Sequence, residues 1–176
     1  MERQGLIHVY TGEAKGKSTA AMGLALRAAG RGFSVLIVQL FKDNTGEKFS
    51  FQKIPNVKYI QFSRASTFFK DYTAPEEELL KQEFFVFWNL INSILDSEKI
   101  GLLVLDEISY AFPMQLLSVR QFLDFIESRR AALEIVLTGR NFPDQVISAA
   151  DYVTSMTLVK HPFVSTKLNA RIGIEY

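Results

Sequence analysis

The fold of this chain is decided by the stretch YTGEAKGKST, which runs from Tyr10 to Thr19. It follows an apolar run at residues 6–10 that is typical of a buried strand, and it precedes a mostly apolar run at 20–27 that is typical of a helix. A strand, a glycine-bearing loop, Gly-Lys-Ser and a helix form the order of a phosphate-binding P-loop. In that arrangement backbone N–H groups and the positive end of the helix attract an anion.

The residue types within this loop favour a nucleotide over a plain turn. Lys17 offers a mobile positive charge for phosphate oxygens, and the Ser18 hydroxyl is a ligand that Mg²⁺ accepts. Only three residues separate Gly12 from Gly16, where the usual pattern has four. The alternative is a basic glycine loop that merely turns the chain. The predicted phosphate-binding residues are Gly12, Glu13, Ala14, Lys15, Gly16, Lys17, Ser18 and Thr19.

Length and composition predict a single domain covering residues 1–176. Hydrophobic residues make up 48% of the chain, the net charge is +1, and there is no cysteine. The charge argues against a nucleic-acid or anionic-membrane partner, and the absence of cysteine excludes disulfides and thiol chemistry. No apolar run reaches the ~18 residues of a membrane span, and the polar start does not resemble a signal peptide. We therefore expect a cytoplasmic protein.

Strand-type and helix-type segments alternate along the rest of the chain. This alternation predicts an α/β fold whose mostly parallel sheet carries helices on both faces. Polar connections are expected at 41–56 and 63–74, and Thr73 with Glu76 forms a predicted capping box before the longest helix. Further strands are expected at 33–40, 57–62, 100–107, 133–137 and 152–159, and further helices at 75–97, 118–130 and 143–150.

Two polar clusters follow predicted strands, as the Gly-Lys-Ser loop does. Because ligands bind at the carboxyl ends of parallel strands, we expect these clusters to share one site. Asp106 and Glu107 are a carboxylate pair suited to Mg²⁺; the alternative is a solvated strand end. Arg140 could neutralise phosphate or form a structural ion pair. His161 has no second histidine nearby, so a structural or peripheral role is favoured.

The ordered motifs together resemble the P-loop ATP:corrinoid adenosyltransferases of cobalamin biosynthesis. The matching segments are YTGEAKGKSTAA at 10–21, VQLFK at 38–42, GEK at 46–48, VLDEISY at 104–110, LTGR at 137–140, VKHPF at 159–163 and RIGIEY at 171–176. They cover nearly the whole chain, and the short spacing of the glycines is a property of that family. The combination is specific, although no single segment is.

The resemblance implies a RecA-like P-loop fold, usually as a homodimer, that uses ATP with Mg²⁺ or Mn²⁺. Its acceptor would be cob(I)alamin or a precursor corrinoid: Co(I) attacks the ribose 5′ carbon, and triphosphate leaves. By position Ser18 and Glu107 would hold the metal with Asp106 beside them, Lys17 and Glu107 would be catalytic, and Glu47 and Arg140 would lie among the nucleotide-binding residues.

The resemblance also implies that aromatic side chains assist the reduction of Co(II), for which a flavoprotein reductase is a possible partner. Phe68 and Phe69, in the long loop before the longest helix, match that position; packing of the loop is the alternative. Two other functions stay open from the residues alone. One is a P-loop ATPase that drives a conformational change, with Glu107 positioning water, and the other is a nucleotide or corrinoid carrier without turnover.

Overall fold

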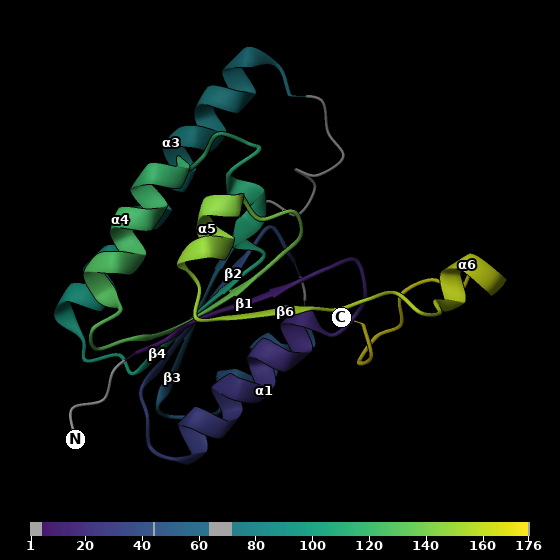
Figure 1. Cartoon of the computed structure of the whole chain (residues 1–176), viewed down its shortest axis with the longest axis horizontal. Helices are drawn as coiled ribbons and strands as arrows, with labels where there is room; N and C mark the ends of the chain where they lie inside the picture. The colour runs from purple at the N-terminus through teal and green to yellow at the C-terminus, as the bar shows by residue number, and fades with distance from the viewer. Residues whose placement is uncertain (1–4, 44, 64–71, 176) are drawn as a thin grey trace.

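The chain forms one six-stranded sheet in which every strand pair is parallel (Figure 1). The computed structural model describes residues 5–43, 45–63 and 72–175. The strand order is β3-β2-β4-β5-β1-β6. The strands are β1 (Ile7–Thr11), β2 (Val35–Leu40), β3 (Val57–Phe62), β4 (Leu102–Asp106), β5 (Glu134–Thr138) and β6 (Tyr152–Ser155). The α/β fold class predicted from the sequence is confirmed.

Helices cover both faces of the sheet. They are α1 (Lys17–Gly30), α2 (Gly46–Phe51), α3 (Ala74–Ser97), α4 (Val119–Arg129), α5 (Asp144–Ala149) and α6 (Pro162–Thr166), with a single 3₁₀ turn, η2 (Ile108–Ala111), among the described residues. Figure 1 shows α1 on one side of the sheet and α3, α4 and α5 on the other. Within β2, Leu36 and Val38 belong to the core under α3 and α4, whereas Val35 and Ile37 belong to the core under α1. The strand is apolar at every position except Gln39 because both of its faces are buried.

The two longest helices illustrate how the sequence sets their ends and faces. In α3 the Thr73 backbone N–H donates to Glu76 Oε2 at 2.9 Å, which is half of the predicted capping box. The same helix buries Phe84 beside Trp88, whose ring lies 4.8 Å from that of Phe125 on α4. On the opposite side α1 buries small residues at a spacing of four, which brings it close to the sheet.

Two expectations about secondary structure were wrong in detail. The connection at 41–56 contains the short helix α2, which buries a single large side chain, Phe51. The strand expected over 152–159 ends at Ser155. Among the described residues this strand pairs with β1, which ends at Thr11. Met156 N–H still donates to Thr11 O, but the chain then meets the loop after β1 instead of a strand.

The parallel arrangement brings four chain segments to one edge of the sheet. The residues after β1, β2, β4 and β5 all lie at the carboxyl ends of their strands, where α/β folds place ligands. Among the described residues no helix is both long and apolar enough to cross a membrane.

Candidate active site

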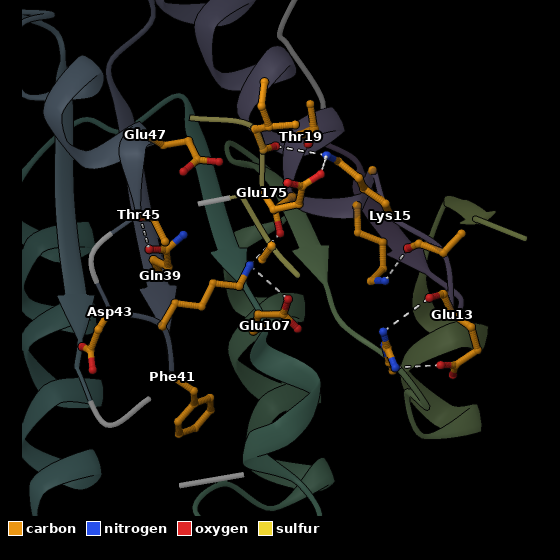
Figure 2. Close-up of a pocket in the computed structure, with 18 of the residues that line it drawn as sticks. Glu13, Lys15, Thr19, Gln39, Phe41, Asp43, Thr45, Glu47, Glu107 and Glu175 are labelled. Carbon is orange, nitrogen blue, oxygen red and sulfur yellow. Dashed lines mark hydrogen bonds and ion pairs between the residues drawn. The ribbon is translucent and has the colours of Figure 1, made fainter. Parts of the chain in front are cut away.

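An open cleft of about 570 Å³ lies at this edge (Figure 2). Its size is within the ordinary range of small-molecule sites. Its wall combines the loop after β1, the segment after β2, the start of α2 and part of the C-terminal tail. The lining residues are Glu13, Ala14, Lys15, Gly16, Lys17, Ser18, Thr19, Gln39, Phe41, Lys42, Asp43, Thr45, Glu47, Glu107, Arg140, His161, Ala170, Ile174 and Glu175.

Glycine is required at both ends of the loop that precedes α1. Gly12 has φ 97° and Gly16 has φ 118°, in the left-handed region that other residues rarely adopt. A Cβ on Gly12 would lie 2.4 Å from the carbonyl oxygen of Met156. Ala14 N–H donates to that same oxygen at 3.0 Å, so the short loop is fixed against the end of β6.

Lys17 lies inside the curve of this loop. Its ammonium donates to the carbonyl oxygens of Gly12 at 2.8 Å and Ala14 at 2.9 Å, and only 7% of the residue is exposed. Burial, together with the positive charge of Arg140, lowers the pKa of Lys17 below its ordinary value. A buried cation that donates to neutral carbonyls is suited to an anionic ligand such as phosphate.

Asp106 is a fully buried carboxylate whose oxygens are already occupied. Oδ1 accepts from Thr138 at 2.6 Å, and Oδ2 accepts from Gln39 at 3.1 Å and from Lys42 at 2.9 Å. Burial opposes ionisation, but the Lys42 ammonium and these hydrogen bonds overcome it and lower the pKa of Asp106 below its ordinary value. The side chain is therefore a fixed anion at the base of the cleft.

The side chain of Glu107 points in a different direction from that of Asp106. Its φ of 65° is unusual for a residue with a side chain, and its N–H donates to the Thr138 hydroxyl at 2.9 Å. That backbone turn follows Asp106 directly, so one carboxylate points into the protein and the other, with 14% of its side chain exposed, lines the cleft. Its Oε1 lies 3.0 Å from the ammonium of Lys42.

Lys42 connects the start of α1 with the carboxylates of Asp106 and Glu107. Its ammonium lies 2.8 Å from Ser18 Oγ, 2.9 Å from Asp106 Oδ2 and 3.0 Å from Glu107 Oε1. Burial lowers the pKa of Lys42, but the two carboxylates raise it by more, so that it is above the ordinary value. No role of Lys42 was predicted from the sequence, although all three of its partners were predicted to lie at the metal.

The three oxygens around Lys42 also provide a test of whether a divalent cation fits. Each lies within 3.0 Å of one positive group, and each is a hard oxygen donor of the kind that Mg²⁺ prefers. No group of three His, Cys, Asp or Glu side chains in the described part of the chain could hold a metal. This donor set fits an ion that takes one or two carboxylates and completes its shell with phosphates and water.

A buried polar network supports the base of the cleft. Gln39 Oε1 accepts from the hydroxyls of Thr45 at 2.7 Å and Tyr59 at 2.6 Å, and from Gln61 Nε2 at 3.1 Å. Burial raises the pKa of Tyr59 to about 12. Because the same Gln39 side chain donates to Asp106, the network ties the segment after β2 to the acidic pair.

The family of the chain is shown by comparison with known proteins. Residues 3–176 match the family model described as ATP:corrinoid adenosyltransferase BtuR/CobO/CobP. The chain belongs to this family.

Three relatives are named corrinoid adenosyltransferase. The Pseudomonas aeruginosa protein is 34% identical over 178 residues, which span 99% of this chain and 85% of the relative. The Sinorhizobium protein is 30% identical (99% and 82%), and CobA of Salmonella typhimurium is 29% identical (99% and 87%).

In this adenosyltransferase-family chain, most of the predicted site residues line the one cleft. Glu47, Thr19 and Ser18 lie on its wall. Gly12 and Asp106 contact residues of the wall instead, Gly12 through Lys17 and Asp106 through Lys42. The roles assigned to them stay predictions. Phe68 and Phe69 lie outside the described residues, so their predicted position is not described here.

Several site residues make contacts that the sequence did not indicate. Arg140 pairs with Glu13, Nη1 to Oε2 at 2.7 Å, which is the ion-pair alternative, although it also lines the cleft. Lys15 donates at 3.0 Å to the Glu175 carboxylate, so the C-terminal tail lies beside the loop, as Figure 2 shows. His161, expected to be structural or peripheral, lines the cleft and accepts from the N–H of Phe163 through Nδ1. No local sequence pattern identifies the tail, because its position depends on the tertiary fold.

Proposed function

We propose that this protein transfers the 5′-deoxyadenosyl group of ATP to Co(I) of a corrinoid in the synthesis or salvage of adenosylcobalamin. One observation carries the proposal. In a chain of the ATP:corrinoid adenosyltransferase family, the phosphate-type loop and Glu107 line a single cleft at the carboxyl ends of the strands, with Asp106 buried next to Glu107. In the reaction the Co(I) electron pair forms the bond to C5′, the C5′–O5′ bond breaks, and its electrons leave with triphosphate.

The described residues suit the departure of triphosphate. The leaving group gains negative charge as the C–O bond breaks, and charges already in position stabilise it without reorganisation. Lys17 is such a charge, held in the loop by the carbonyls of Gly12 and Ala14. The N-terminus of α1 adds the positive end of a 14-residue helix dipole.

A divalent cation is part of the proposal. Ser18 and Glu107 would hold Mg²⁺ or Mn²⁺ with Asp106 beside them, and the ion would supply neutralisation of phosphate charge. Asp106 is fully buried and accepts three hydrogen bonds, so its contribution is to fix the site in place. Arg140 and Glu47 would border the nucleotide.

The acceptor, the partners and the compartment are proposed from the family. The acceptor is cob(I)alamin or a precursor corrinoid, the reductant a flavoprotein reductase, and the assembly a homodimer in the cytoplasm. Phe68 and Phe69 would assist the reduction of Co(II). The alternative of an ATPase has less support, because the matching family model and the relatives reported above are named as corrinoid adenosyltransferases.

Product identity tests the proposal. The purified protein is incubated anaerobically with ATP, Mg²⁺ and chemically reduced cobalamin, and formation of the cobalt–carbon bond is followed by absorbance. We expect one triphosphate for each adenosylated corrinoid, and no product from ATP when the corrinoid is omitted. Release of ADP and phosphate without corrinoid would establish hydrolysis instead, and tight ATP binding with no product would establish a carrier.

A further inference from the structure

The ammonium of Lys42 occupies the position that a metal ion would need. Its three N–H donors face three oxygens, on Ser18, Asp106 and Glu107, at 2.8, 2.9 and 3.0 Å. These oxygens come from the start of α1, the end of β4 and the turn after it. The ammonium is thus opposite in charge to the donor set proposed for the divalent cation and matches it in number, with three donors for three oxygens.

The backbone that carries Lys42 is firmly held. Phe41, just before it, has φ 57° and is 1% exposed, with its ring 5.8 Å from that of Phe62 and 6.4 Å from that of Phe84. The carbonyl oxygen of Lys42 accepts from Gln61 Nε2 at 2.6 Å. The fold therefore fixes the backbone from which the Lys42 side chain reaches the three oxygens.

An ammonium and a divalent cation cannot share these oxygens. Mg²⁺ binds oxygen at about 2.0–2.1 Å and needs near-octahedral space, so the lysine must leave before the ion can enter. Repulsion between the two cations at this separation adds to the steric conflict. The side chain has somewhere to go, because 28% of it is exposed and it lines the cleft. Its four-carbon stem is flexible, and its charge suits phosphate oxygens.

We propose that Lys42 excludes free Mg²⁺ from Ser18, Asp106 and Glu107, and that it moves to phosphate oxygens only when nucleotide binds. Metal and nucleotide then enter together. This inference rests on the proposed function in that the incoming phosphates belong to ATP. The device would also keep the buried Asp106 carboxylate neutralised whenever nucleotide is absent, which avoids an unpaired charge at a fully buried position.

The first test uses Mn²⁺ alone as the probe, without nucleotide or corrinoid, with free Mn²⁺ measured by electron paramagnetic resonance. Removing the ammonium in Lys42→Met should strengthen Mn²⁺ binding by about tenfold or more, because the competing cation is gone. Lys42→Arg keeps the charge and should bind Mn²⁺ as weakly as the parent. Adding Glu107→Gln to Lys42→Met should remove the gained affinity.

Lys15→Met is the matched control for a general change of charge. Lys15 lines the same cleft but pairs with Glu175, so its loss should leave Mn²⁺ affinity within about twofold. The proposal is overturned if Lys42→Met binds Mn²⁺ no better than the parent. It is equally overturned if Lys15→Met gains as much, or if Glu107→Gln does not remove the gain.

A second measurement needs no variant and therefore does not depend on whether Lys42→Met folds. Millimolar Mg²⁺ alone should leave the melting temperature of the parent unchanged, whereas Mg²⁺ with ATP should raise it, since a ligand of the folded state stabilises it. A rise with Mg²⁺ alone would contradict the proposal. Failure of the proposed function would look different: adenosyl transfer would be absent while the Mn²⁺ results for Lys42→Met stood.

Discussion

Asp106→Asn is expected to destabilise the fold by about 3 kcal/mol, a value that follows from the surroundings of this side chain. Asparagine keeps the shape and can still accept from Thr138. Its amide N–H groups would then face the ammonium of Lys42 and the amide of Gln39, donor against donor. Breaking a buried ion pair costs about 3–5 kcal/mol, and we take the lower part of that range because Lys42 is 28% exposed and keeps Glu107.

Urea and thermal unfolding in metal-free buffer measure this change. For a chain of this size 1 kcal/mol moves the melting temperature by roughly 2–4 °C, so a fall of about 6–12 °C is expected. The difference in stability between Asp106→Asn and the parent should shrink in acid. The folded pKa of Asp106 is lowered, so its stabilising effect is present above the unfolded value near 3.8 and is lost as the pH falls through the folded value.

Two comparisons isolate the cause. Asp96→Asn removes a carboxylate that pairs with Arg129 but is 65% exposed, and it should cost less than about 1 kcal/mol. Combining Asp106→Asn with Lys42→Met should cost about 1–3 kcal/mol less than the sum of the single changes, because neither charge is then left alone. A loss below about 1 kcal/mol for Asp106→Asn, or strict additivity with Lys42→Met, would refute this reasoning.

Three further predictions concern other parts of the site. Lys17→Ala should reduce adenosyl transfer by ~10²–10³-fold in a protein that still melts cooperatively; near-parental turnover would reject the role of Lys17. Glu107→Gln should raise the Mg²⁺ concentration needed for half-maximal transfer, and an unchanged Mg²⁺ response would move the metal role to another residue. Between pH 10 and 12 the free energy of unfolding should fall less in Tyr59→Phe than in the parent. The folded pKa of Tyr59 is about 12, so its contribution is complete below pH 10 and is lost as the pH rises through 12; parallel curves for variant and parent would contradict this.

The sequence predicted the central strands of the sheet well because these strands are buried on both faces. Segments 35–40 and 102–106 are each apolar at all positions but one. Helix α2 was missed because six residues with one buried phenylalanine carry no readable period. The strand at 152–155 was drawn too long because residues 156–159 contain strand-type side chains. Its true end is set by where β1 stops, which is tertiary information.

The predicted parts of the site depend on local sequence, and the missed parts depend on tertiary structure. Residues 12–19 and the pair 106–107 were found because their chemistry lies in a continuous string of sequence next to a strand. Lys42 is one lysine after a strand, and nothing local distinguishes it from a solvated one. Its importance appears only when the pairing of β2 with β4 brings it to Asp106 and when α1 presents Ser18 from the same edge.

Two lysines of the cleft are already engaged before any nucleotide arrives, Lys17 with carbonyl oxygens and Lys42 with carboxylates. ATP must therefore exchange these contacts instead of ordering free side chains, which limits the entropy lost on binding but also limits the net gain from each new contact. Under the proposed function this balance favours catalysis over tight substrate binding. Exchanging these lysine contacts for phosphate oxygens is nearly even in free energy while the triphosphate is still part of ATP. The exchange becomes favourable as charge develops on the departing triphosphate. An interaction that strengthens along the reaction is the kind that raises the rate.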